Sequence, residues 1–297
     1  MLMEDTKIRR VVFILHGIRD YDVWGTELKR QIDAELGPGS DTVVVVPKYG
    51  YFPLAPFLLW SDRQKKVRWF MDSYTEELAH YPSATTFDFI GHSNGTYILA
   101  SALQKYRTLK VNDVYFAGSV VPQKYQWMNL VRDQKRVHSV RNVVATNDWV
   151  VAIFPRLFEQ IAEWRGLDAD FGSLDIGAAG FRGFQDAGRP QSGVRDIQFA
   201  DGTHGTGVDL ETGPKRAALV RFGRYGLDDA QDRAFDDAFK NARTQNAFMD
   251  GLSNVSWAAW LAIAVIVAAI GALLWKWKRY WAVVPYGALV LLFLNSF

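Results

Sequence analysis

The sequence predicts an α/β fold in which a mostly parallel sheet of about six strands is flanked by helices and followed by a membrane tail. Short β-branched runs alternate with segments of helical spacing along most of the chain, a pattern typical of a parallel sheet covered by helices. A glycine-rich turn joins one of these runs to a small-residue helix, and an uncharged apolar run lies near the C-terminal end. The 297 residues suffice for one globular unit with an appendage.

Each expected strand is a short run rich in β-branched or aromatic side chains. The six runs span residues 10–15, 42–46, 86–90, 113–117, 140–145 and 194–199. Apolar residues at helical spacing predict helices at 23–36, 62–81, 95–106 and 155–164. The glycine-rich stretch 166–193 is expected to be a long loop, and 227–248 an amphipathic helix that leads into the tail.

Charge and cysteine content exclude several classes of function. The chain has 34 basic and 32 acidic residues, a formal net charge of +2 and no long charged block, so a nucleic-acid partner is not expected. It has no cysteine, which removes disulfides, thiolate nucleophiles and cysteine metal ligands. The N-terminal stretch lacks the apolar length and cleavage-like site of a signal peptide. We therefore expect the globular part to stay in the cytoplasm.

The stretch FDFIGHSNGTYILASAL, residues 87–103, places Gly91, Ser93 and Gly95 between an expected strand and an expected helix. A serine at a sharp strand-to-helix turn has a strained backbone and an exposed hydroxyl, and glycines two residues to either side let strand and helix pack closely. This pattern predicts that Ser93 is a nucleophile. The alternative is an ordinary glycine-rich turn.

A serine nucleophile needs a general base and a carboxylate that orients it. His204 follows the last expected strand on a loop, where an imidazole can reach Ser93; the alternative is a solvated loop residue. Asp148 directly follows the expected strand 140–145, at the edge where the other two residues emerge. Its alternative role is the N-cap of the next helix. The rival acids lie in the glycine-rich loop and are Asp168, Asp170 and Asp175.

The stretch VVFILHGIRD supplies the next requirement, donors for the oxyanion of an acyl-transfer intermediate. A strand that ends in His16 and Gly17 makes a tight turn in which the Ile18 N–H faces the substrate carbonyl. The Asn94 N–H, directly after the nucleophile, is the second donor. We expect His16 to be structural, with its ring bonded within the loop.

On these motifs, residues 8–206 resemble the α/β-hydrolase family, and most closely the compact bacterial lipases and esterases. The resemblance implies ester hydrolysis through an acyl-serine intermediate, without a metal or organic cofactor. It implies a catalytic triad of Ser93, His204 and Asp148 and an oxyanion hole of Ile18 and Asn94. The chain departs from the family because its first two strands are missing, which makes it a minimal member, and because it carries a membrane-like tail.

Two aromatic stretches are candidates for binding an acyl chain. The stretch YGYFPLAPFLLW, residues 49–60, follows a strand, so Tyr49, Tyr51 and Phe52 are expected on the same side of the sheet as the nucleophile. Phe154 lies in a second stretch that could cover the site. These side chains are interpreted as substrate-binding, and residues 49–60 also as a contact with the membrane surface. The alternative is that they belong to the apolar core.

The apolar run WAAWLAIAVIVAAIGALLW, residues 257–275, has no charge and nearly the length of a membrane-spanning helix. A second apolar segment, 281–294, predicts a transmembrane hairpin. The basic residues between the segments would place their loop in the cytoplasm, and two full crossings would then put the globular part outside. Because Pro285 and Gly287 interrupt the second segment, a re-entrant or interfacial segment is the alternative.

These observations predict a catalytic domain at 1–226, a linker helix at 227–250 and a membrane tail at 251–297. The predicted function is a membrane-anchored serine hydrolase that cleaves a carboxylic ester, most naturally that of a lipid, with thioesters and amides left open. The alternative is a membrane-localised interaction or effector protein, which uses the fold as a binding module or the tail to perturb the bilayer. Homo-oligomerisation is also left open.

Overall fold

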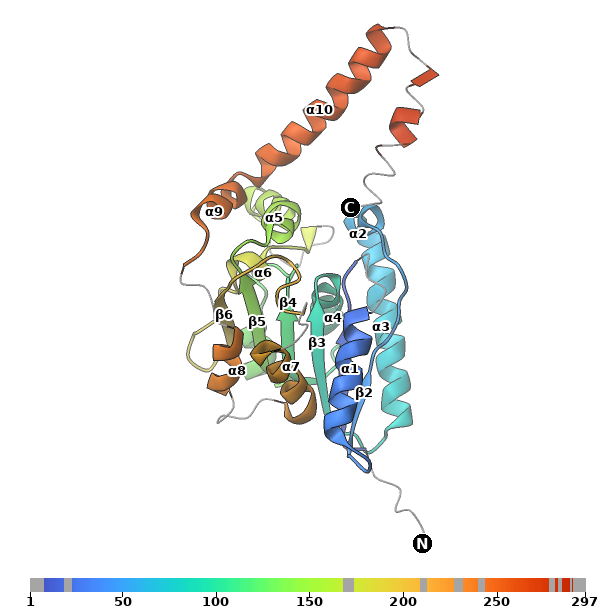
Figure 1. Cartoon of the computed structure of the whole chain (residues 1–297), viewed down its shortest axis with the longest axis vertical. Helices are drawn as coiled ribbons and strands as arrows, with labels where there is room; N and C mark the ends of the chain where they lie inside the picture. The colour runs from blue at the N-terminus through green and yellow to red at the C-terminus, as the bar shows by residue number, and fades with distance from the viewer. Residues whose placement is uncertain are drawn as a thin grey trace.

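The computed structural model describes residues 8–18, 23–167, 174–208, 213–226, 232–239, 244–277, 281–282, 285–288 and 290. Six parallel strands form one sheet in the order β2-β1-β3-β4-β5-β6 (Figure 1). They are β1 (Arg10–Leu15), β2 (Thr42–Val45), β3 (Thr86–His92), β4 (Val111–Ala117), β5 (Val137–Ala145) and β6 (Val194–Ala200). This sheet, flanked by helices, confirms the predicted fold class.

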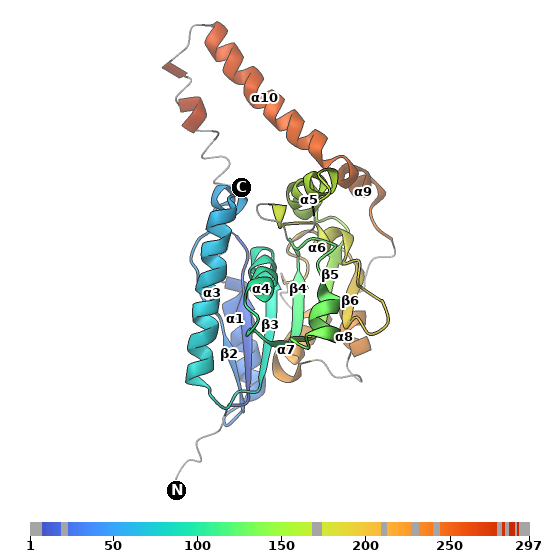
Figure 2. The same cartoon turned by 180° about the vertical axis from the view of Figure 1, so that it is seen from behind.

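Helices cover both faces of the sheet (Figures 1 and 2). In chain order they are α1 (Val23–Leu36), α2 (Leu54–Leu58), α3 (Trp60–His80), α4 (Asn94–Lys105), the π-helix η1 (Asn129–Asp133), α5 (Trp149–Trp164), α6 (Ala179–Arg182), α7 (Pro214–Tyr225), α8 (Asp232–Phe239), α9 (Ala247–Asn254) and α10 (Ser256–Lys276). Two apolar cores result because successive strand side chains point to opposite faces. On β1, Val11 and Phe13 pack with α3 and α4, whereas Val12 and Ile14 pack with α1, α7 and α8.

The segment expected to be a linker helix differs in the structure. Helix α8 packs into the second core, where Phe235 and Phe239 lie against Tyr115, with ring centroids 5.7 Å and 5.6 Å away. Residues 244–246 are not helical, and the Asn246 side chain caps α9 by accepting from the Phe248 and Met249 N–H groups. The described part of 227–248 is therefore two helices, while 227–231 and 240–243 lie outside the described residues.

The stretch expected to be a long loop is partly a buried crossing. Residues 176–181 lie inside the protein, and the Gly177, Ala179 and Gly180 N–H groups donate to the carbonyls of Val120, Val121 and Ser119. These bonds fasten the connection between β5 and β6 to the loop after β4. Residues 168–173 of this stretch lie outside the described residues.

Helix α10 is the single helix among the described residues that is long and apolar enough to cross a membrane, and none of its apolar window is buried. The second apolar segment, 281–294, is described only in short pieces. Within them, Tyr286 Oη donates to the Val267 carbonyl at 3.0 Å, so the chain turns back along α10.

Gln160 of α5 joins the globular part to α9 and α10. Its Nε2 donates to the carbonyls of Ser253 at 3.2 Å and Asn254 at 2.8 Å, and its Oε1 accepts from Ser256 Oγ at 2.6 Å. We call these three bonds the Gln160 clasp. Farther along α10, Trp260 Nε1 donates to the carbonyl of Ile153 at 3.3 Å. The first turns of α10 are thus bound directly to α5.

Asp196 of β6 holds a carboxyl group inside the protein. It accepts hydrogen bonds from Asn142 Nδ2 and from the Phe184 N–H, both at 2.8 Å. Burial raises the pKa of Asp196 from 3.8 to about 7, and the two hydrogen bonds oppose only part of this rise. The folded protein therefore binds this proton more tightly than the unfolded chain does. The contribution of Asp196 to stability is full below its unfolded pKa and is lost as the pH rises through its folded pKa.

We expect the free energy of unfolding of the wild type, relative to an Asp196→Asn variant, to fall by an amount on the order of 4 kcal/mol between about pH 4 and about pH 8. Urea unfolding of both proteins in the same detergent, at several pH values, measures this difference. A difference that stays constant across the range contradicts the prediction.

Candidate active site

Ser93 stands at the junction of β3 and α4 with φ 51° and ψ −119°, a backbone conformation that residues other than glycine rarely adopt. Its N–H donates to the Ala117 carbonyl at 3.0 Å, and its carbonyl accepts from the Thr96 N–H at 2.9 Å and Thr96 Oγ1 at 2.6 Å. These bonds hold the strained turn in place at the carboxyl end of the sheet.

Both glycines of the turn are closely packed, Gly95 against backbone and Gly91 against a side chain. A β-carbon at Gly95 would lie 2.4 Å from the Leu15 carbonyl oxygen, and one at Gly91 would lie 2.6 Å from a Phe89 ring carbon. The helix therefore starts against the end of β1 at a distance that only glycine permits. The glycine spacing in the sequence predicted this close packing of strand and helix.

The turn after β1 lies directly against Ser93. A β-carbon at Gly17 would lie 2.7 Å from Ser93 Cβ and 3.3 Å from Ser93 Oγ. Ile18 follows in the same turn, and Asn94 is the first residue of α4, where backbone N–H groups have no acceptor within the helix. Ile18 directly follows Gly17, which packs on the Ser93 side chain, and Asn94 directly follows Ser93 itself. Both residues predicted to form the oxyanion hole therefore lie beside the candidate nucleophile in the chain.

His16 and Tyr49 support this turn from inside. Their rings stack with centroids 4.0 Å apart, and Tyr49 Oη lies 2.8 Å from the His16 carbonyl and 2.7 Å from the Gly17 carbonyl. His16 Nδ1 lies 2.7 Å from the Gly17 carbonyl as well. Asn94 Nδ2 donates to Tyr49 Oη at 3.2 Å, which ties the turn to the start of α4.

Asp148 and His204 lie within hydrogen-bond distance. His204 Nδ1 is 2.9 Å from Asp148 Oδ2 and 3.1 Å from Oδ1, and Asp148 Oδ1 also accepts from the Val151 N–H at 3.0 Å. The carboxylate can only accept, so Nδ1 carries the proton and Nε2 of the neutral ring keeps its lone pair. Asp148 is fully buried at the N-terminus of α5, where the helix dipole favours its negative charge.

His204 is held beside the serine turn by its neighbours. Its ring packs on Gly118, where a β-carbon would lie 2.7 Å from Cε1, and Gly118 directly follows the residue that accepts from the Ser93 N–H. His92 Nε2 lies 3.2 Å from the His204 carbonyl. Among the described residues, however, no hydrogen bond joins Ser93 Oγ to His204. Such bonds often tighten only when substrate is bound.

His92 is a neutral positioning group. Burial lowers the pKa of His92 from 6.5 to about 3, with a further contribution from the neighbouring His204. A neutral His92 that donates from Nε2 to the His204 carbonyl supports the loop of the candidate base without adding a charge to the site.

The residues predicted to bind substrate occupy different environments. Tyr49 and Phe52 are buried in the core, where their rings meet edge to face with centroids 6.2 Å apart. Tyr51 is exposed at the surface. Phe154 is half-buried and lies edge-on to Trp260 of α10, with ring centroids 5.1 Å apart. For Tyr49 and Phe52 the core interpretation describes the structure better, because Tyr49 supports the turn after β1 and Phe52 packs on Tyr49 in the core.

The rival acid Asp175 has a structural place of its own. It pairs with Arg63 at 2.7 Å and accepts from Tyr97 Oη at 2.7 Å. Asp168 and Asp170 lie outside the described residues. No group of three or more metal-ligating side chains occurs within the described part of the chain.

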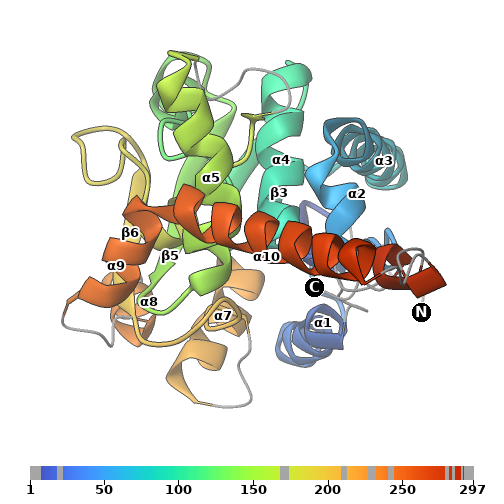
Figure 3. The same ribbon diagram turned by 90° about the horizontal axis from the view of Figure 1, so that it is seen from above.

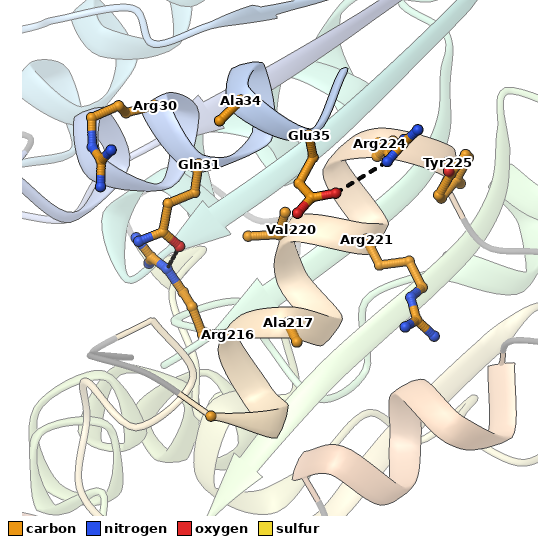
Figure 4. A pocket seen from close by; sticks show the side chains of 11 residues that line it. Arg30, Gln31, Ala34, Glu35, Arg216, Ala217, Val220, Arg221, Arg224 and Tyr225 are labelled. Carbon is orange, nitrogen blue, oxygen red and sulfur yellow. Dashed lines mark hydrogen bonds and ion pairs between the residues drawn. The ribbon is translucent and has the colours of Figure 1, made fainter. Parts of the chain in front are cut away.

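A cleft of about 610 Å³ lies elsewhere, between α1 and α7 (Figure 4). Its walls include Arg30, Arg216, Arg221 and Arg224, and its lining residues do not include Ser93, Asp148 or His204. Among the described residues, Gly213, the last residue before α7, is the one lining residue from the connection that carries His204. Several of these arginines already hold partners in the protein: Arg30 bonds Glu27, Arg216 bonds Gln31 and Arg224 bonds Glu35. The cleft is therefore not part of the candidate active site.

Sequence reasoning did not single out His92 or Gly118 as supports of His204. Gly118 lies within the stretch VYFAGSV, and a glycine directly after a buried strand is a signal of close approach by another group. His92 was noted only as part of the glycine motif. Its contact with the His204 carbonyl depends on how the loop after β6 folds back, for which the sequence holds no local signal.

No protein-family model and no curated protein matches this chain. Among solved structures, an uncharacterized protein from Bacillus cereus is 12% identical with a TM-score of 0.40, over 57% of this chain and 53% of that one, so this chain spans about half its length. A YdeN-like hydrolase from Pectobacterium atrosepticum is 15% identical with a TM-score of 0.34, over 74% and 92%. A cutinase-like protein from Cryptococcus sp. is 11% identical with a TM-score of 0.28, over 79% and 97%. The chain itself has an α/β fold, with a six-stranded parallel sheet and a strained serine turn after β3.

Proposed function

We propose that the protein is a membrane-anchored serine hydrolase that cleaves a carboxylic ester of a lipid. The observation that carries this proposal is the Asp148–His204 pair next to Ser93, a serine at positive φ between two closely packed glycines. An orienting carboxylate, a base and a strained serine are the parts that acyl transfer requires.

In the proposed mechanism, Ser93 Oγ attacks the ester carbonyl carbon while His204 Nε2 takes the hydroxyl proton. The carbonyl oxygen becomes an oxyanion, which the N–H groups of Ile18 and Asn94 stabilise. The bond to the alcohol then breaks, and the alcohol leaves with the proton from His204. Water adds to the acyl-serine by the same route in reverse and releases the carboxylic acid. Asp148 keeps the ring oriented and stabilises the imidazolium in both steps.

Membrane anchoring through α10 supports a lipid as the substrate. Helix α10 has the length and apolar composition to cross a bilayer, and its first turns are bound to α5, the helix that Asp148 caps. The candidate site is thereby kept close to lipid. Thioesters and amides can be cleaved by the same chemistry. We propose a lipid ester because α10 would keep the candidate site close to lipid.

Labelling with a fluorophosphonate probe tests the proposal. The probe reacts with an activated serine, so we expect the full-length protein in detergent to be labelled and the Ser93→Ala variant to be unlabelled. Ser101→Ala is the matched control, because Ser101 is a buried serine of α4 that bonds only Gln64 among the described residues. Its labelling should equal that of the wild type. A folded wild-type protein that takes no label contradicts the proposal and favours an interaction protein that uses the fold for binding.

A further inference from the structure

Large apolar side chains are exposed at the carboxyl end of the sheet, around the candidate site. Leu59, between α2 and α3, is 56% exposed, Trp60, the first residue of α3, is 42% exposed, and Tyr51 precedes them at 41%. Trp149, at the start of α5, is 43% exposed, and Phe248 of α9 is 77% exposed. We call these five residues the apolar rim. Exposed aromatic and leucine side chains grouped in this way mark a contact with another apolar surface.

Helix α10 leaves the protein from the same end. Figures 1 and 2 show α2, α5 and α9 at one end of the molecule, with α10 rising from α9 beyond them. Seen from above, α10 crosses from α9 toward α2 (Figure 3). The helix therefore leans over the part of the rim that Leu59 and Trp60 form.

This lean determines which part of the protein meets the bilayer. Spanning helices run at modest tilts from the bilayer normal, about 20° on average. Because the Gln160 clasp binds α10 to α5, the helix and the globular part turn together. Turning the protein so that α10 approaches the bilayer normal moves the α2 side of the globular part toward the bilayer. The rim at Leu59 and Trp60 then approaches the lipid surface.

We propose that the apolar rim is a second membrane contact, which seats the catalytic end of the protein in the interfacial layer of the bilayer that holds α10. Tryptophan and tyrosine suit this layer, since their rings have an apolar body and a polar group. The ester would then enter the site from the bilayer. The inference rests on the membrane insertion of α10 in the proposed function and adds the orientation of the site.

Two lysines behind the rim fit a lipid surface. Lys105 Nζ lies 5.1 Å from the Trp60 ring centroid, and Lys66 Nζ lies 5.3 Å from that of Phe52. An ammonium group beside an aromatic ring can reach lipid phosphates while its apolar stem packs on protein. This arrangement favours a phospholipid surface over a purely apolar protein partner.

The two ends of α3 provide a matched test. Leu59 precedes α3 in the rim, and Leu78 lies near its other end with 43% exposure, ~27 Å from Trp60 at 1.5 Å per residue. The chain has no cysteine, so Leu59→Cys and Leu78→Cys each introduce one site for a nitroxide label. Val265→Cys places a third label on an exposed position of α10. The full-length proteins are reconstituted in vesicles of phosphatidylcholine and phosphatidylglycerol.

Electron paramagnetic resonance then compares collisions of each label with oxygen, which concentrates in lipid, and with a water-soluble nickel complex. We expect a several-fold higher oxygen-to-nickel ratio at 59 than at 78, with 265 higher still. A high ratio at 265 with equal, water-like ratios at 59 and 78 overturns the rim contact and leaves the membrane anchor intact. A water-like ratio at 265 overturns the anchor of the proposed function, and the rim inference with it.

Discussion

Replacing Asp148 by asparagine is expected to lower kcat for ester hydrolysis by roughly 10⁴-fold. The asparagine amide can donate to His204 Nδ1, which moves the ring proton to Nε2 and removes the lone pair that would accept the serine proton. Asparagine caps a helix as well as aspartate does, so the bond from the Val151 N–H and the start of α5 should persist. The fall in kcat would then result from the altered protonation of His204 alone. Steady-state kinetics on a short-chain ester, in detergent, measure it.

Asp175→Asn is the matched control for this variant. Asp175 holds Arg63 and Tyr97, so its replacement should lower the free energy of unfolding and leave kcat close to that of the wild type. A severe loss of kcat in Asp175→Asn, with an active Asp148→Asn variant, would assign the acid to the glycine-rich stretch and contradict our proposal.

A Gly95→Ala substitution is expected to destabilise the protein by about 2 to 4 kcal/mol and to abolish serine labelling. The new β-carbon would lie 2.4 Å from the Leu15 carbonyl oxygen. This oxygen belongs to the backbone of a central strand, so it cannot rotate away, and α4 must shift together with Ser93. Urea unfolding in detergent and fluorophosphonate labelling measure the two effects.

Gly251→Ala serves as the control for the glycine variant. Gly251 lies within α9, and a β-carbon there would meet no atom within 4 Å. Because alanine favours helix more than glycine does, this variant should be unchanged or up to about 1 kcal/mol more stable. Equal stabilities of the two variants would show that the close packing at Gly95 is not required.

The strands and the serine turn were predictable because their signals are local. A β-branched run between turn residues specifies a strand by itself, and each of the six lies within three residues of its predicted bounds. Gly91, Ser93 and Gly95 likewise carry their geometry in their own spacing. The sequence leaves two roles open for Asp148, the N-cap of α5 and the partner of His204. In the structure its carboxylate makes both contacts.

The supports of the site were harder to predict because they join distant segments. Tyr49 was interpreted as a substrate contact, but its hydroxyl bonds carbonyls more than thirty residues earlier in the chain. In the segment 227–248, amphipathic spacing indicated one helix, and a single capping residue, Asn246, sets the start of a second. Long-range pairs of this kind leave no periodic pattern in a sequence.

Helix α5 carries both Gln160, to which the tail is fastened, and Asp148, its N-cap residue. A disturbance of α10 is therefore transmitted along α5 to the group that orients His204. In the proposed membrane-anchored enzyme, the surroundings of α10 and the position of the Asp148 carboxylate are thereby linked through α5. Under this proposal, kcat is expected to vary with the detergent or lipid that surrounds α10.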